Sequence, residues 1–169
     1  YGGSKYTSEI LCNVYKASYN LNTISLRFSN IYGPNSFHKE SVVSLYIKKI
    51  LNNENIHVYG DGEQSRDFLY IDDLTNIIKK CIYSKTSGAF QLGTGKPTSI
   101  NTLIGILDKK FKKKKIFLKK QYKPARHGEV KKTWCDISKA KKILGFHPKI
   151  DINDGIDKTV NFFLKNENN

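Results

Sequence analysis

Residues 1–30, YGGSKYTSEILCNVYKASYNLNTISLRFSN, place a helical pattern directly before a strand. Apolar side chains recur at helical spacing as far as about Tyr19, which predicts one amphipathic helix. After an Asn-rich break, residues 23–28 alternate in polarity and begin with β-branched side chains, as a strand does. A helix followed by a strand in this way is typical of a fold in which the two kinds of element alternate.

The first five residues also carry a candidate for proton transfer. Tyr1 and Lys5 are four residues apart, so on a helix they lie on the same face. A tyrosine is a poor base at neutral pH because its ordinary pKa is about 10, but a cation beside it favours the phenolate. The pair can therefore take a proton from a hydroxyl group. A Tyr-x-x-x-Lys spacing alone is more typical of a helix surface with a solvated lysine.

The rest of the chain continues the alternation of helices and strands and predicts an α/β fold. Helix starts are expected at Ser41, at Asp72 or Asp73, at Ser99, at Asp136 or Ser138, and at Asn153, with a glycine C-cap at Gly145. Strands are expected at residues 56–59, 67–71, 88–93 and 116–118.

Composition suits a soluble globular chain. The 169 residues, 38% of them hydrophobic, are enough for one domain with a sizeable core. The sequence has no run of 18 apolar residues, so no membrane contact is expected. Cys12, Cys81 and Cys135 are scattered and show no metal-ligand spacing. We therefore expect reduced thiols, a cytoplasmic location and no metal site.

The net charge of +14 admits a second class of function, a non-catalytic domain that binds nucleic acid or another polyanion. Eight lysines lie between Lys109 and Lys120. No nucleic-acid-binding motif accompanies them, and a lysine run of this kind is more typical of a solvated helix end. We expect no nucleic-acid partner.

The chain contains no methionine, even at position 1, and no strand in it is followed by a Gly-x-x-Gly-x-x-Gly fingerprint. We therefore expect it to be the C-terminal part of a longer protein, with most of any dinucleotide site in the preceding part. By itself such a fragment is expected to have little or no activity.

Several ordered segments together resemble one family, the extended short-chain dehydrogenases/reductases. They are Tyr1-x-x-x-Lys5, LRFSNIYGP at 26–34, VYGDGEQSRDF at 58–68, LGTG at 92–95, RHGEV at 126–130, DISKA at 136–140 and LGFHP at 144–148. Within that family the segments look like those of NAD-dependent nucleotide-sugar epimerases and dehydratases, and they extend over essentially the whole chain.

The resemblance implies a fold in two parts. Residues 1–33 would be the end of a Rossmann-type, doubly wound NAD-binding domain. Residues 34–169 would form mainly a smaller α/β lobe for the nucleotide sugar, with residues 67–95 returning to the Rossmann sheet.

The resemblance also implies a role for each site residue. Tyr1 would be the catalytic base, and Lys5 would hold the ribose of NAD and keep the pKa of Tyr1 low. Asn30 matches an amide that contacts the sugar or its phosphate. The remaining matches are Arg66 and Arg126 to pyrophosphate-binding arginines, Glu129 to a ribose acceptor, and Val58 and Tyr59 to the strand along the nucleobase. Guanidinium groups suit pyrophosphate because they bind its oxygens in a bidentate way.

Three activities of this family remain open. The RHGEV loop and the segment around Asn101 look most like those of UDP-sugar 4-epimerases, which oxidise the sugar transiently to a 4-keto form. The segment around Asn30 is similar to that of dTDP-glucose 4,6-dehydratases, but their usual His-Asp pair is replaced here by Gly128-Glu129. A UDP-glucuronate decarboxylase is the third possibility. The sequence decides neither the sugar nor the choice between NAD and NADP.

The first helix carries apolar side chains on more than one face. Tyr6, Cys12 and Tyr19 extend the stripe made by Ile10, Leu11, Val14 and Tyr15. A helix of this kind is usually buried on two sides. Members of the family usually pair this helix across a subunit interface, so we expect a homodimer.

Overall fold

The computed structural model describes residues 1–166, so the last three residues of the predicted range 34–169 lie outside the described part. In chain order the elements are α1 (Gly2–Tyr19), β1 (Ile24–Phe28), β2 (Asn30–Tyr32), α2 (Val42–Leu51), β3 (Asn55–Tyr59), β4 (Ser65–Tyr70), α3 (Ile71–Ile82), β5 (Gly88–Leu92), β6 (Pro97–Ser99), α4 (Ile100–Lys112), β7 (Lys119–Lys123), α5 (Ser138–Leu144) and α6 (Ile152–Asn166).

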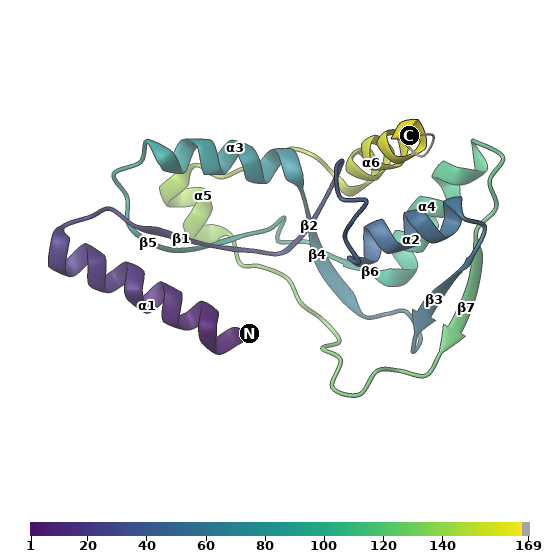
Figure 1. Ribbon diagram of the computed structural model, residues 1–169, viewed down its shortest axis with the longest axis horizontal. Helices are drawn as coiled ribbons and strands as arrows, with labels where there is room; N and C mark the ends of the chain where they lie inside the picture. The colour runs from purple at the N-terminus through teal and green to yellow at the C-terminus, as the bar shows by residue number, and fades with distance from the viewer. Residues whose placement is uncertain (167–169) are drawn as a thin grey trace.

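One part of the molecule is built around the parallel pair β1 and β5 (Figure 1). Helix α1 lies on one side of this pair, and α3 and α5 cover the other. The core on the α3 side contains Leu69, Leu74, Phe90, Ile137 and Phe146, which are at most 6% exposed. These apolar contacts join three distant stretches of chain into one layer.

The other part holds the larger core. Strand β4 pairs in parallel with β2 and antiparallel with β6, and β3 pairs in parallel with β7. Helices α2, α4 and α6 lie against these strands (Figure 1). Ile56, Leu103, Leu107, Phe111 and Ile156 are fully buried between them. Strand β4 contributes to both cores, and it therefore connects the two parts of the fold.

Two buried carboxylates fasten loops to this framework. Asp67, 1% exposed, accepts hydrogen bonds from the amides of Thr94 (2.8 Å), Gly95 (3.0 Å) and Cys135 (3.2 Å). Asp73 accepts from the amides of Lys149 and Ile150, each at 3.0 Å. A carboxylate satisfied by several N–H donors is a strong anchor even when it is buried.

The anchoring role of Asp73 corrects a helix prediction. Helix α3 begins at Ile71 with Tyr70 as its N-cap, so neither Asp72 nor Asp73 caps it, although both lie in its first turn. Helix α6 likewise begins at Ile152, before the predicted cap Asn153. The carboxylate of Asp151 accepts the amides of Asn153 and Asp154 there.

Other local predictions are confirmed. The Ser99 hydroxyl accepts the Thr102 amide at the start of α4, and Gly145 ends α5 with φ 60°, in the left-handed region. The strand predicted at 116–118 is wrong, since the strand is β7 at 119–123. Its residues are mostly polar because β7 pairs with β3 on one side only.

Helix α1 has no buried residue along its whole length. Tyr6, Leu11, Tyr15 and Tyr19 are each at least 50% exposed. The polar contacts of α1 with the rest of the fold include the Arg27–Glu9 ion pair and a hydrogen bond that the Thr23 hydroxyl donates to the Cys12 carbonyl. No helix within residues 1–166 is long and apolar enough to cross a membrane.

One glycine is required by close packing, which gives a stability prediction. The Tyr32 hydroxyl lies against Gly155 of α6 so closely that an added Cβ would overlap it. We expect Gly155→Ala to destabilise the fold by about 1–3 kcal/mol, the usual effect of overpacking a core. Gly105 of α4 is the matched control, because nothing lies within 4 Å of its added Cβ. Gly105→Ala should stabilise by about 0.5–1 kcal/mol. Urea unfolding of both variants checks this pair, and equal effects would contradict it.

Candidate functional site

A cavity of about 290 Å³ lies between β3, β4, α2 and the loop that follows β7. Its lining includes Asn30, Tyr59, Arg66, Arg126 and Glu129. The fold therefore brings together five of the six residues expected to bind substrate, from four separate segments of the chain. We call this space the first cavity.

A tight turn between β3 and β4 brings Tyr59 and Arg66 to this place. Gly60 and Gly62 have φ values of 63° and 77°, which side chains other than glycine rarely adopt. The Asp61 carboxylate accepts the Glu63 amide at 2.9 Å and closes the turn. The Gly-x-Gly motif thus explains why these two residues, at opposite ends of the turn, face one cavity.

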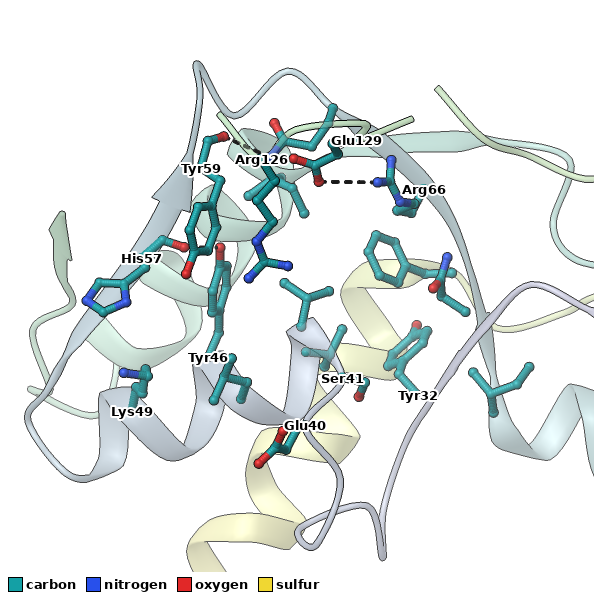
Figure 2. A pocket seen from close by; sticks show the side chains of 18 residues that line it. Tyr32, Glu40, Ser41, Tyr46, Lys49, His57, Tyr59, Arg66, Arg126 and Glu129 are labelled. Carbon is teal, nitrogen blue, oxygen red and sulfur yellow. Dashed lines mark hydrogen bonds and ion pairs between the residues drawn. The ribbon is translucent and has the colours of Figure 1, made fainter. Parts of the chain in front are cut away.

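Arg66 is held in position by the chain that follows β7. Its Nη1 donates to the carbonyls of Ser65 (2.8 Å) and Val130 (2.7 Å). Its Nη2 lies 3.3 Å from the Glu129 Oε1, an ion pair that Figure 2 shows at the rim of the cavity. The Arg66 side chain is 22% exposed, so its charge is only partly screened. Arg66 and Glu129 therefore fix each other before any ligand arrives.

Arg126 takes its place by stacking. Its guanidinium carbon lies 3.9 Å from the centroid of the Tyr59 ring, a close cation–π contact. Figure 2 shows the guanidinium pointing into the cavity, with Tyr46 and Tyr59 on one side and Tyr32 and Arg66 on the other. Two permanent positive charges thus face one space, with aromatic rings at one end of it.

Two tyrosines of the wall were not predicted from the sequence. The Tyr46 hydroxyl donates to the His57 carbonyl at 2.8 Å, and burial raises the pKa of Tyr46 to about 12. Burial likewise raises the pKa of Tyr32. Both phenols therefore stay neutral at physiological pH and serve as walls, not bases. Their helical and strand positions look like ordinary core positions, so the sequence held no signal for this role.

The remaining predicted residues lie at different distances from this cavity. Asn30 lines it and donates from Nδ2 to the Asp67 carbonyl at 3.3 Å, which leaves its side-chain oxygen as an acceptor. Val58 is fully buried in the larger core and does not line the cavity.

Tyr1 is the N-cap residue of α1 and Lys5 lies in its first turn, and neither lines the first cavity. Tyr1 is 97% exposed, and the Lys5 amine lies 5.3 Å from the centroid of its ring. The two side chains are therefore adjacent, as the helical spacing predicts. No group of three or more His, Cys, Asp or Glu side chains within residues 1–166 is placed to hold a metal ion.

The arrangement suits an elongated anionic ligand. Two fixed guanidinium groups match the oxygens of a pyrophosphate. Glu129 offers an acceptor for hydroxyl groups, and the Tyr46 and Tyr59 rings offer apolar surface for a flat group. These features together are the chemistry expected for a nucleoside diphosphate.

Comparison with known proteins agrees with this geometry. Residues 1–159 match the family model described as GDP-mannose 4,6 dehydratase. The chain is 37% identical over 167 residues to a UDP-glucuronate 4-epimerase of Thermodesulfobacterium geofontis, covering 98% of this chain and 50% of that protein. The chain spans about half the length of the relatives that it matches.

Solved structures give the same result. A UDP-glucose 4-epimerase of Thermotoga maritima, solved with UDP-glucose, matches with a TM-score of 0.87 and 34% identity over 98% of this chain and 53% of that one. The UDP-glucuronic acid 4-epimerase of Bacillus cereus, solved with UDP-glucuronic acid and NAD, matches with a TM-score of 0.84 and 28% identity, over 97% of this chain and 52% of that one. The predicted α/β, Rossmann-type class is confirmed by these likenesses.

Proposed function

The chain belongs to the GDP-mannose 4,6 dehydratase family, within the extended short-chain dehydrogenases/reductases, and on that premise we propose that it is part of an NAD-dependent UDP-sugar 4-epimerase. The observation that carries the proposal is the convergence of Arg66 and Arg126 on one cavity with Tyr59 and Glu129. The epimerases named among its relatives favour this activity over others of the family.

In this proposal the nucleoside diphosphate fills the first cavity. Arg66 and Arg126 bind the pyrophosphate, and the base lies toward the Tyr46 and Tyr59 end. Glu129 accepts hydrogen bonds from the ribose. To do so, it gives up part of its ion pair with Arg66. Asn30 receives the sugar or its phosphate, since it lines the cavity and keeps a free acceptor.

The division into parts follows the two cores. We propose that β1, β5 and their helices belong to the NAD-binding domain, and that the lobe with the larger core binds the nucleotide sugar. Residues 67–95 include β5, whose pairing with β1 supports the expected return to the first sheet. Helix α5 also packs on this sheet, although it lies outside residues 1–33 and 67–95, which were expected to form the NAD-binding part.

In this proposal Tyr1 is the catalytic base, and Lys5 is its neighbour on the same face of the helix. Tyr1 takes a proton from a sugar hydroxyl and later returns it, and the Lys5 amine lies beside it, 5.3 Å from the centroid of its ring. When bound, NAD would accept a hydride from the sugar and give it back. The exposed Tyr1–Lys5 pair fits such a cofactor, because both side chains can reach a ribose and a sugar placed against α1.

The test is conversion of UDP-glucose by the complete enzyme. Proton NMR should show its C4 epimer accumulating to equilibrium, without net formation of NADH. A 6-deoxy-4-keto sugar as the product would contradict the epimerase and support a dehydratase, the activity that gives the family its name. The 169-residue chain alone should retain no NAD, because it carries no glycine-rich fingerprint.

We propose further that the complete enzyme is a homodimer formed through α1. The helix exposes Tyr6, Ile10, Leu11, Val14 and Tyr15 over more than one face. Apolar area of this extent on a helix marks an interaction surface. Light scattering at micromolar concentration should therefore give twice the subunit mass.

A pair of variants makes the dimer prediction specific. Leu11→Glu combined with Tyr15→Glu should shift the protein to monomers. Ile82→Glu is the matched control, because Ile82 is 69% exposed on α3, on the other side of the β1–β5 pair. Monomers before any substitution would contradict the dimer, and so would a dimer unaffected by the α1 changes.

A further inference from the structure

A second cavity, of about 450 Å³, lies between the loop at residues 94–98, the end of α5 and the segment that leads into α6. We define it by Lys96, Lys141, His147, Lys149 and Asp151, which line it together with apolar side chains. Its volume is in the range of cavities that hold small molecules. None of these five residues lines the first cavity.

The walls of the second cavity are fixed by the framework. Asp67 holds Thr94 through its amide at 2.8 Å and its hydroxyl at 2.7 Å. Asp73 holds the amides of Lys149 and Ile150 at 3.0 Å. Both carboxylates are at most 6% exposed, so water competes little for these contacts. The cavity therefore exists before a ligand arrives, and binding need not order the chain.

Its charge is positive. Lys96, Lys141 and Lys149 form no ion pair with any carboxylate of residues 1–166. The one carboxylate in the lining, Asp151, already accepts the amides of Asn153 at 2.7 Å and Asp154 at 3.2 Å. Three lysines around a concave site attract an anion with more than one charge more strongly than lysines spread over a convex surface do.

The lining is also partly apolar. Phe68 forms part of the wall with Pro148 and Ile152, and Thr98 adds a hydroxyl group. An inorganic ion alone would leave this apolar surface in water. A small organic molecule with a phosphate group would meet both the ammonium groups and the apolar wall.

We propose that the second cavity binds a phosphorylated small molecule, with the phosphate held by Lys96, Lys141 and Lys149. Phe68 also lines the first cavity and belongs to β4, the strand that carries Arg66. The two cavities thus meet at Phe68, and different basic side chains line each of them. The proposal does not depend on the activity assigned to the first cavity.

The test is an NMR titration of the full 169-residue chain with inorganic phosphate and then with a hexose phosphate. Backbone amides of residues 94–98 and 147–153 should shift and saturate, at lower concentration with the hexose phosphate. Lys141→Gln combined with Lys149→Gln should weaken binding at least about tenfold, as expected for lost contacts to a charged group. The matched control, Lys113→Gln with Lys114→Gln, removes the same charge from the turn after α4 and should change nothing.

A second pair of variants separates the two cavities. With Arg66→Ala and Arg126→Ala combined, the shifts at 147–153 should persist, because neither arginine lines the second cavity. Shifts confined to the loop of Arg126 would overturn the proposal. So would shifts spread evenly over the lysine-rich surface, or an equal loss of affinity in the control.

Discussion

Replacing Tyr1 by phenylalanine should lower the turnover of the complete enzyme at least about 10²-fold, the usual effect of losing an acid–base group. The ring and its contact with Lys5 remain in this variant, and only the hydroxyl that exchanges the proton is lost. Tyr1 does not line the first cavity, so affinity for the nucleotide sugar should stay nearly the same. Steady-state kinetics should show a fall in kcat with little change in KM.

Tyr6 provides the matched control for this variant. It is a second exposed tyrosine on α1, one residue beyond Lys5, and it has no assigned role in proton transfer. Tyr6→Phe removes only the hydroxyl and keeps the ring that belongs to the proposed α1 interface, so turnover should stay within about twofold. If the Tyr1 and Tyr6 variants behave alike, Tyr1 is not the base.

Removal of either cavity arginine should weaken UDP-sugar binding by about 1.5–3 kcal/mol, as for a lost hydrogen bond to a charged group. Arg66→Ala should have the broader effect, because Arg66 also fixes the carbonyl of Val130 and the carboxylate of Glu129. Arg126→Ala removes a charge that is positioned by stacking on the Tyr59 ring. Calorimetric titration with a UDP-sugar measures both effects.

Two further variants test how the arginines act. Arg66→Lys should recover only part of the affinity, because an ammonium group keeps the charge but cannot form the bidentate contact. Arg27→Ala is the control, since Arg27 pairs with Glu9 and lies outside the cavity. In the complete enzyme, loss of NAD without loss of UDP-sugar binding would show that Arg66 and Arg126 are misassigned.

Local sequence signals predicted the elements best where the deciding contacts are local. The Ser99 cap and the Gly145 helix end depend on neighbouring residues, and both were predicted correctly. Asp73 was misassigned as a cap because its carboxylate binds amides 76 and 77 residues away. Strand β7 was misplaced because its polar residues pair with β3, a partner that local periodicity does not reveal.

The candidate site shows the same difference between local motifs, which the sequence reveals, and contacts between distant residues, which it does not. The motifs around Arg66 and Arg126 identified residues that do meet in one cavity. Their mutual contacts were not predictable, since the Arg66–Glu129 pair joins positions 63 residues apart. Val58 lies next to the cavity in sequence but faces the core, because a strand beside a cavity also has a face that packs inward. The walls formed by Tyr32 and Tyr46 became apparent only from the packing of distant segments.

A calorimetric titration of UDP into the 169-residue chain, without NAD, tests most directly whether the first cavity binds the nucleotide. The first cavity lies wholly within residues 30–129 of this chain, so the nucleotide site should be present without any further segment. We expect saturable binding of one UDP per chain that is weakened by Arg66→Ala and by Arg126→Ala but not by Arg27→Ala. Absence of saturable binding by the folded chain, or binding that both arginine variants leave unchanged, would contradict it.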